Sequence, residues 1–351
     1  MTSPPPARAG AATWAALLVV YLVWGSTYLA IRVLVRSTPP LLAMGVRFTA
    51  AGLLLAAFLA ARHGPGVLRV PWRRALPAAA VGILLLGAGN GGVAVAEQVV
   101  PSGLAALLVS AVPLWLVCLR LLARDRPPRT TIAGTALGFA GIAILALPGS
   151  HPAGTRIWGV LVIIGATICW STGSFITPRL PLPPNPFVAT VCEMLAAGLA
   201  LVVAGGVAGE FGRMRLSTMP VQAWVALVYL VLFGSLLAFS AYVWLLANAP
   251  LSLTATYAYV NPVVAVVLGA LILGEQVTWP ILLGGAVVVA GVSLVVSAER
   301  PRHARRNAGR PARTGTGQPS RDGQPVHVPG RTSRDGQPVG GQARQVPGQP
   351  R

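Results

Sequence analysis

Ionisable side chains inside long apolar runs are the first candidates for chemistry in this sequence. Arg47, Glu97 and Glu193 each lie within such a run. A charge at the centre of a bilayer costs roughly 2.5–3.5 kcal/mol on insertion scales, so such a side chain is expected to face protein or a water-filled cavity. These three residues are therefore candidates for binding, gating or coupling.

Two interpretations are open for each of the three. Arg47 binds a substrate carboxylate or phosphate, or it lies near the outer membrane interface and snorkels there or pairs with Glu97. Glu97 forms an outer gate by ion pairing with Arg47, or it is a wet interfacial carboxylate. Glu193, the most deeply placed acid, is a proton-coupling candidate, or it is a packed structural acid that satisfies a neighbouring hydroxyl or indole N–H.

Polar-tipped aromatic residues and one asparagine form a second group. Asn261 precedes Pro262, and a proline removes a backbone hydrogen bond from the carbonyl four residues earlier, here Ala258. Two interpretations follow. In the first, the Ala258 carbonyl and the Asn261 amide face a substrate; in the second, Pro262 only bends a helix for packing. Aromatic residues near the ends of apolar runs belong to the interfacial belt by default, whereas those in the middle could line a cavity. The substrate-binding candidates are Trp24, Tyr28, Arg47, Trp170, Tyr257 and Asn261.

No catalytic set is visible. The sequence has no Gly-rich phosphate loop, no His or Cys at metal-ligand spacing and no nucleophile motif beside a base, so we expect no enzyme activity, no metal and no cofactor. Cys118, Cys169 and Cys192 lie in apolar runs without a CxxC pattern and are expected to pack as small apolar residues.

The composition is that of a membrane protein. Of 351 residues, 54% are hydrophobic and 10% are charged, whereas about a quarter are charged in ordinary soluble domains. A helix that spans a bilayer needs about 20 apolar residues. We therefore predict an all-α integral membrane protein with ten transmembrane helices, at 13–35, 40–61, 75–98, 102–122, 130–148, 156–178, 187–208, 222–246, 252–273 and 280–297.

The arginines predict the orientation. All 27 basic residues are arginine, and they are divided between short loops and a C-terminal tail, so the net charge of +19 forms no basic face for nucleic acid. With the N-terminus inside, the cytoplasmic loops hold nine arginines and the opposite loops hold four, so both termini are expected in the cytoplasm. No cleavable signal peptide is apparent, because the first run is long enough to span the membrane.

The apolar runs of the first half of the chain are repeated in the same order in the second half. Four pairs of runs match at offsets of 146 to 150 positions, so the chain is expected to use a five-helix unit twice. Because each unit has an odd number of spans, the second copy is inverted, as in many secondary transporters whose substrate site lies near the midplane between the halves. The matched positions include Trp24 with Trp170, Arg47 with Glu193, Pro113 with Pro262, Gly134 with Gly284 and Gly141 with Gly291.

Four segments follow from this pattern. They are an N-terminal cytoplasmic segment at 1–12, the two five-helix repeats at 13–148 and 149–298, and a tail rich in Arg, Pro, Gly and Gln at 299–351. The tail cannot bury a core and is expected to be disordered. Its arginines touch anionic lipid headgroups at the inner leaflet, or the tail is solvated and dispensable.

Several short motifs, taken together, resemble the EamA-like permeases of the drug/metabolite transporter superfamily, over about residues 13 to 297. No single motif is specific, but their order and spacing together are. They are Trp24-Gly25-Ser26-Thr27, Arg47-Phe48, Pro101-Ser102-Gly103-Leu104-Ala105-Ala106-Leu107 with Pro113, and Tyr259-Val260-Asn261-Pro262-Val263-Val264-Ala265 through Leu273-Gly274-Glu275.

The resemblance implies two inverted halves around a central cavity that works by alternating access, often as an exporter of amino acids, metabolites or toxic compounds. It does not fix a substrate. Many relatives carry an acidic residue after the fourth span, where this chain has Arg124 and Asp125, and this departure argues against a symmetric role for Glu275.

The hypothesis from the sequence is a secondary transporter in the inner membrane, with a small-molecule substrate, membrane lipids around it and a possible homodimer as its partners. Without a nucleotide motif, uphill transport would be coupled to an ion or would depend on a partner. The rival is a membrane-embedded sensor or structural partner that keeps the fold without transport.

Overall fold

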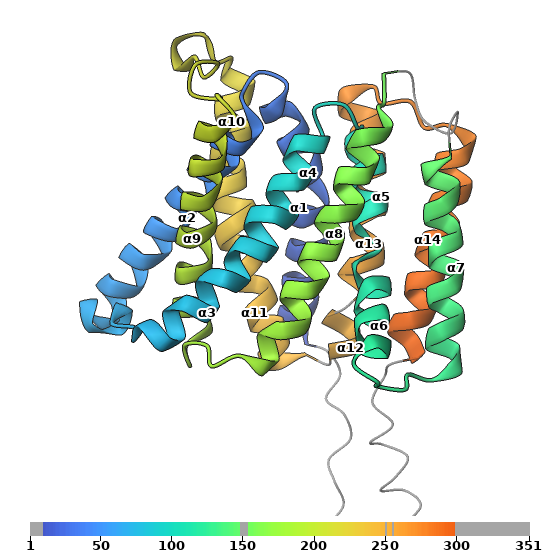
Figure 1. The fold of residues 1–351 in the computed structure, drawn as a ribbon, viewed down its shortest axis with the longest axis horizontal. Coiled ribbons are helices and arrows are strands. Elements are labelled where there is room, and N and C mark those ends of the chain that lie inside the picture. Colours follow the sequence, from blue (N-terminus) through green and yellow to red (C-terminus); the bar gives the residue numbers. More distant parts are fainter. Residues whose placement is uncertain (1–9, 148–153, 250, 255, 299–351) are drawn as a thin grey trace, which may run out of the picture. The chain divides into compact units, whose positions relative to one another are not determined.

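The computed structural model describes residues 10–147, 154–249, 251–254 and 256–298. The predicted tail at 299–351 and most of the N-terminal segment lie outside the described residues. The described part is all helical and contains no strand (Figure 1). Its helices are α1 Ala11–Val35, α2 Pro40–His63, η1 Pro65–Leu68, α3 Trp72–Gly82, η2 Ile83–Asn90, α4 Gly91–Ala96, α5 Ser102–Val109, α6 Val112–Leu122, α7 Arg129–Ala146, α8 Ile157–Ile176, η3 Thr177–Arg179, α9 Pro186–Val207, η4 Leu216–Thr218, α10 Val221–Tyr229, η5 Leu230–Leu237, α11 Ala238–Asn248, α12 Leu251–Thr254, α13 Tyr257–Leu273 and α14 Trp279–Ala298.

Nine helical stretches in the described part are long and apolar enough to cross a membrane. Each of them begins and ends within three residues of one of the spans expected from the sequence. The span expected at 252–273 is different, because it is divided into the short α12 and the 17-residue α13. The chain is thus a multi-pass membrane protein, and the count of ten spans stays a prediction.

Proline and hydroxyl side chains explain the interruptions. The fourth span breaks after α5 because Pro113, in the first turn of α6, has no N–H to offer the carbonyl of Val109. Ser110 turns back there and donates to the Leu107 carbonyl at 2.6 Å. In the second half Pro262 lies inside α13 instead, and the break comes earlier, where Thr256 donates to the Leu253 carbonyl at 2.5 Å. The two repeats therefore bend at different places.

Two π-helical segments lie at matching positions of the two halves. η2 continues α3 into α4, and η5 continues α10 into α11, so each is set in the middle of a span. They are 147 residues apart at both ends, the offset expected from the sequence repeat. A π-helical turn widens the helix and is frequent at functional sites.

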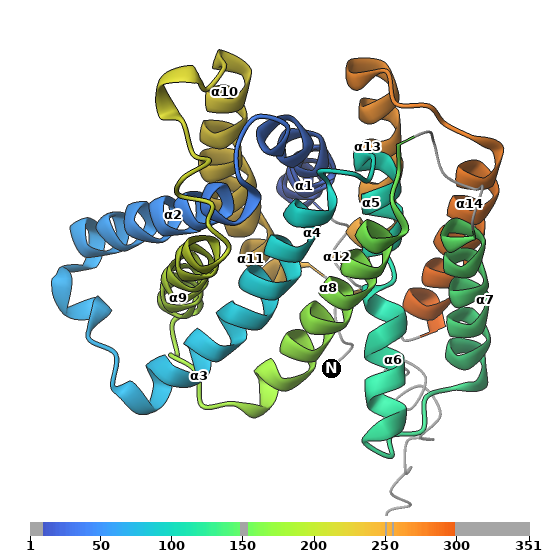
Figure 2. The same cartoon turned by 45° about the horizontal axis from the view of Figure 1, so that its top comes forward.

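Helices from the two halves pack against each other in pairs. α7 lies beside α14 and α2 beside α9 in both views (Figures 1 and 2). Glycines make these contacts close: a Cβ atom added at Gly141 would stand 2.6 Å from the backbone nitrogen of Val288, and one at Gly45 would stand 3.1 Å from the backbone nitrogen of Val202. Such close approach is how helices associate in lipid, where hydrophobic burial gives little driving force.

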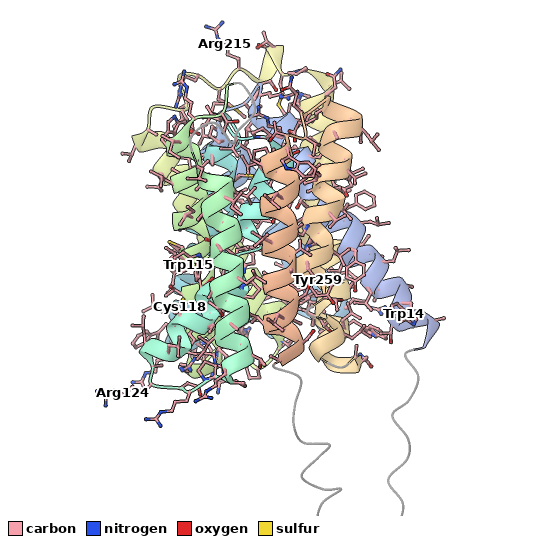
Figure 3. All side chains as sticks on the ribbon, turned by 90° about the vertical axis from the view of Figure 1, so that its right-hand side faces the viewer. Trp14, Trp115, Cys118, Arg124, Arg215 and Tyr259 are labelled. Atoms are coloured by element: carbon pink, nitrogen blue, oxygen red, sulfur yellow. The ribbon has the colours of Figure 1, made fainter. Side chains whose placement is uncertain are left out.

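The two ends of the helix bundle carry different numbers of arginines. Arg124 lies at the end of the bundle where Trp14 lies in the first turn of α1, and Arg215 lies at the opposite end (Figure 3). Nine of the described loop and helix-end arginines belong to the first end, which we call the arginine-rich end: Arg62, Arg69, Arg73, Arg74, Arg120, Arg124, Arg126, Arg129 and Arg179. The second end carries five: Arg32 in the last turn of α1, Arg36, Arg156, Arg213 and Arg215.

Glu275 joins the two halves at the second end. Its carboxylate accepts hydrogen bonds from the backbone N–H of Ser102 at 2.8 Å, from the Ser102 hydroxyl at 3.0 Å and from the backbone N–H of Gly103 at 3.1 Å. It therefore caps the N-terminus of α5, where a negative charge also meets the positive end of the helix dipole. Asp125, 150 positions earlier, instead pairs with Arg120 at 2.7 Å and stays half exposed. Among the described residues the two acids therefore have different partners.

Candidate functional site

A cavity of about 410 Å³ lies between the two halves. Helices α1, α2, α4, α5 and α6 and the π-helical η2 line it from the first half, and α8, α11, α12, α13 and α14 line it from the second. The volume is within the range of small-molecule sites, about 300–1,000 Å³. All six substrate-binding candidates lie on its wall, namely Trp24, Tyr28, Arg47, Trp170, Tyr257 and Asn261.

Arg47 lies in α2 and is only 4% exposed. Its Nε donates to the Ser235 hydroxyl of η5 at 3.1 Å, and its guanidinium stands 4.8 Å from the centroid of the neighbouring Phe48 ring. Its Nη1 is buried and has no hydrogen-bond partner among the described residues. The expected alternative, snorkelling at the membrane interface, is wrong for this arginine because the side chain is enclosed by protein.

Three aromatic rings form a cluster on the cavity wall, which we call the aromatic cluster. The Trp24 ring centroid is 5.1 Å from that of Tyr242 and 5.3 Å from that of Tyr257, and the two tyrosine centroids are 5.7 Å apart. The Trp24 indole N–H donates to the Gly234 carbonyl at 3.2 Å. η5 therefore fixes both the aromatic cluster, through Gly234, and the Arg47 guanidinium, through Ser235.

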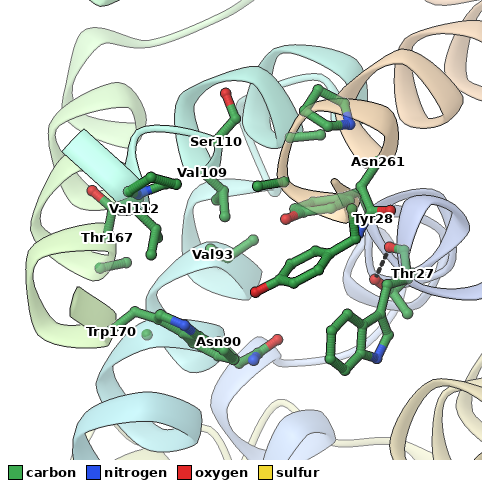
Figure 4. A pocket seen from close by; sticks show the side chains of 18 of the residues that line it. Thr27, Tyr28, Asn90, Val93, Val109, Ser110, Val112, Thr167, Trp170 and Asn261 are labelled. Carbon is green, nitrogen blue, oxygen red and sulfur yellow. Dashed lines mark hydrogen bonds between the residues drawn. The ribbon is translucent and has the colours of Figure 1, made fainter. Parts of the chain in front are cut away.

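The remaining candidates bring polar groups to the cavity. Figure 4 shows Trp170 and Asn90 on one side of the pocket, with Tyr28 and Thr27 on the other. Asn261 is 7% exposed, and its Oδ1 is buried without a hydrogen-bond partner in the described part of the chain. The cavity thus combines apolar walls with a few polar groups, as expected of a site for a small organic molecule.

Glu97 and Glu193 do not line the cavity. Glu97 is fully buried, so the alternative of a wet interfacial carboxylate is wrong. Neither of its carboxylate oxygens has a hydrogen-bond partner, and within the described residues it makes no ion pair with Arg47. The nearer arginine is Arg32, whose Nη1 donates to the Glu97 backbone carbonyl. The ion-paired gate is therefore absent from this conformation.

Glu193 is half-buried in α9, and its backbone passes close to Gly82 of α3. Its position is equivalent to that of Arg47 in the first half, yet only Arg47 reaches the cavity. Its role in proton coupling stays a prediction.

Some lining residues were missed by the sequence reasoning. Asn90, Thr27 and Arg120 face the cavity, and Ser235 supports Arg47 from behind the wall. Asn90 carried a usable signal, because an amide inside an apolar span is expected to face the protein interior. Ser235 carried none, since a serine in a membrane helix can bond its own backbone and needs no external partner.

No group of His, Cys, Asp and Glu that could hold a metal ion occurs in the part that the structure describes.

Comparison with known proteins decides the family. The model of the EamA-like transporter family matches residues 12–147 and again residues 157–297. The chain belongs to the EamA-like transporter family. The two matches also agree with the duplicated unit expected from the sequence.

Curated relatives cover most of the chain. It is 44% identical over 282 residues to the "Uncharacterized inner membrane transporter YedA" of Escherichia coli K12, which covers 80% of this chain and 89% of that protein. It is 31% identical to the "Probable terminal-alkyne amino-acid exporter" of Streptantibioticus cattleyicolor, over 86% of this chain and 98% of the relative. A "Probable amino-acid metabolite efflux pump" of Salmonella typhimurium is 26% identical, over 83% of this chain and 97% of the pump. The protein is thus a membrane transporter.

A crystal structure of a protein 22% identical in sequence superposes with a TM-score of 0.56, covering 84% of this chain and 100% of the other. At this identity the likeness supports the fold alone.

Proposed function

We propose that this EamA-like transporter moves a small metabolite, an amino acid or a drug across the inner membrane by alternating access, and that it works as a secondary exporter. The observation that carries the proposal is the cavity of about 410 Å³ between the two halves, on whose wall all six candidate residues lie. A site between two inverted repeats is the arrangement in which rocking of one half against the other exposes it to each side in turn.

The relatives named as an exporter and as an efflux pump support the outward direction, and the arginine-rich end supports the orientation in the membrane. Positively charged loops face the cytoplasm, so this end and both termini are inside. The cavity lining extends to Arg120 at this end. At the other end, the Glu275 cap on α5 ties the two halves together. A site whose lining reaches the arginine-rich end is placed to meet substrate from the cytoplasm during the cycle.

The relatives support the kind of cargo. Their names refer to amino-acid metabolites and to a terminal-alkyne amino acid, which are small molecules with both polar and apolar parts. The cavity offers both kinds of surface, since it combines the aromatic cluster with Arg47 and Asn261. We therefore take amino-acid-sized metabolites as the first compounds to test.

Counterflow in liposomes tests the proposal. Purified protein is reconstituted with an unlabelled panel of amino acids and amines inside, and uptake of the labelled compounds is measured. We expect accelerated exchange of at least one compound, and we expect Trp170→Ala to reduce it because that ring forms part of the cavity wall. The matched control is Trp72→Ala, since Trp72 is 70% exposed at the start of α3. Folded protein that exchanges nothing, or equal loss in both variants, contradicts the transport site.

A further inference from the structure

We propose that Glu275 and the first turn of α5 form the outer gate of the cavity, and that the site opens to the outside when the hydrogen bonds between them break. This inference rests on the proposed function and names the residues that hold the outer side of the transporter closed. It replaces the gate that the sequence predicted, because Glu97 and Arg47 make no ion pair within the described residues.

The protein is closed between the cavity and the second end of the bundle. Four helices that line the cavity, α1, α4, α5 and α13, have one terminus at that end. The residues at these termini do not belong to the lining, and Glu97 and Ser102 are each 0% exposed. At the arginine-rich end the lining instead includes Arg120, whose side chain is 30% exposed. A path from the cavity to the outside therefore has to be made at the second end.

The Glu275 carboxylate joins the two halves at this point. It accepts hydrogen bonds at 2.8, 3.0 and 3.1 Å from Ser102 and Gly103. Its own N–H donates to the Gly269 carbonyl at 3.1 Å, so the turn that carries the carboxylate is fixed to α13. Pro101 precedes α5 and supplies no side-chain cap of its own. The two halves can separate here only if all three bonds to a charged group are broken, and such bonds are stronger than neutral ones.

Helices α5 and α13 also approach each other closely below these bonds. They lie side by side in both views (Figures 1 and 2). A Cβ atom added at Gly103 would stand 3.0 Å from the Cα of Val266, and one at Gly269 would stand 2.9 Å from the Ser102 hydroxyl oxygen. No substrate passes between helices in such contact. Opening therefore requires that α5 and α13 move apart, which is the movement that the Glu275 bonds oppose.

Unpaired polar groups beside the gate favour opening. Both carboxylate oxygens of Glu97 and the Nε of Arg32 are buried without a hydrogen-bond partner in the described structure. The Nη1 of Arg32 donates to the Glu97 backbone carbonyl, and Arg32 also interacts electrostatically with Glu275. Buried polar groups without partners cost free energy, and water that enters on opening would hydrate them. The closed gate thus balances this cost against the Glu275 bonds, so that losing those bonds shifts the population toward the open state.

Glu210 provides a matched control of the same chemistry. Its Oε2 accepts a hydrogen bond from the backbone N–H of Leu42 at 2.9 Å, and it is 3% exposed. Like Glu275, it follows a helix of the second half and caps a first-half helix that begins after a proline, here Pro39. Helix α9, which precedes Glu210, contributes no residue to the lining as the structure describes it. The Glu210 cap therefore joins the halves away from the cavity.

Labelling of one cavity thiol from each side tests the gate without any substrate. In a variant without Cys118, Cys169 and Cys192, Val109→Cys places a thiol at a half-buried position of the lining. A small membrane-impermeant methanethiosulfonate is added to intact cells or to inside-out vesicles. We expect slow labelling in cells and faster labelling in inside-out vesicles. Glu275→Gln should raise the rate in cells roughly 5- to 30-fold, as a loss of one or two strong hydrogen bonds would, without raising the rate in vesicles.

Three further variants assign the parts of the gate. Ser102→Ala removes one of the three bonds and should give a smaller rise in cells than Glu275→Gln. Glu210→Gln should leave both rates unchanged. Glu97→Leu, added to Glu275→Gln, removes two unpaired oxygens and should bring the rate in cells back toward that of the unaltered gate. No such decrease would contradict the role given to Glu97.

The outcomes separate the gate from the proposed function. If Glu275→Gln leaves the rate in cells unchanged, or raises it equally in cells and vesicles as general loosening would, the gate is refuted even where liposome exchange shows transport. If the rate rises in cells alone and no compound exchanges, the gate stands and transport fails. If Glu275→Gln does not fold, the comparison of Ser102→Ala with Glu210→Gln decides, and equal rates in these two variants refute the gate.

Discussion

Arg47 and Glu193 show how one position of the duplicated unit can take two roles. They lie 146 positions apart in α2 and α9, which pack against each other. Arg47 reaches the cavity with Ser235 of η5 behind it, whereas Glu193 lies against α3 and away from the lining. Both copies of the repeat have an ionisable residue at this position. Arg47 in α2 and Glu193 in α9 nevertheless have different surroundings.

Glu193→Gln tests proton coupling at the residue scale. A half-buried carboxyl within the membrane can gain and lose a proton during a cycle, whereas an amide cannot. We expect the variant to lose transport driven by a pH gradient and to keep substrate exchange, as measured in liposomes with and without an imposed gradient. Glu210→Gln is the matched control, because Glu210 is an acid outside the cavity lining, in the loop after α9, and should leave both activities intact.

An unchanged response to the pH gradient would remove Glu193 from the mechanism. The next acid to test would then be Glu97, which is fully buried with both carboxylate oxygens unpartnered in the described structure.

At the scale of elements, the capping of α5 and the two π-helical segments distinguish this fold from a simple bundle. Glu275, which follows α13, supplies three acceptor contacts to the start of α5, so a residue of the second half completes a helix of the first. η2 ends at Asn90, which lines the cavity, and η5 carries Ser235, which accepts a hydrogen bond from Arg47. The π-helical segments therefore contribute to the site together with the regular helices.

Glu275→Gln tests the cap. The amide keeps one acceptor and loses the charge that meets the helix dipole, so we expect a loss of about 1–2 kcal/mol of stability, measured as a lower unfolding temperature in detergent. Asp125→Asn breaks an exposed ion pair at the equivalent place and should cost less than about 1 kcal/mol. Equal losses in the two variants would show that the cap adds nothing beyond a surface charge pair.

At the scale of the whole molecule, the two halves pack through α7 with α14 and α2 with α9, and they enclose the cavity between them. The family model matches each half separately, in agreement with a duplicated unit. The inverted relation of the halves is a proposal that follows from an odd number of spans per unit.

Cysteine labelling tests the inverted arrangement. In a variant without Cys118, Cys169 and Cys192, Arg124→Cys and Gln276→Cys place single thiols at exposed positions after equivalent helices of the two halves. A membrane-impermeant maleimide added to intact cells should label position 276 and not position 124, because the arginine-rich end faces the cytoplasm. Labelling of both positions from the same side would contradict inversion, whatever the overall orientation.

The sequence by itself determined the class, the helices and the duplication of this protein. Long apolar runs have one stable solution in a bilayer, in which every backbone group bonds within its own helix, so nine spans were located within three residues. The six candidate side chains were identifiable because polar groups are costly in lipid and must face the interior. The division of the ninth span into α12 and α13 was not predicted, since it depends on side chains such as Thr256 that bond locally to the backbone.

Only the tertiary structure decided which polar groups share one cavity. Arg47 and Glu193 have equivalent places in the repeat, and nothing in the spacing separates them. Both pack against the third span of the other half, but Arg47 meets Ser235 there, whereas the position equivalent to Ser235 in the first half is Ala88. Ser235 became part of the site only through its contact with Arg47. Helix periodicity fixes where a side chain lies along its own helix, whereas the packing of distant helices fixes what it faces.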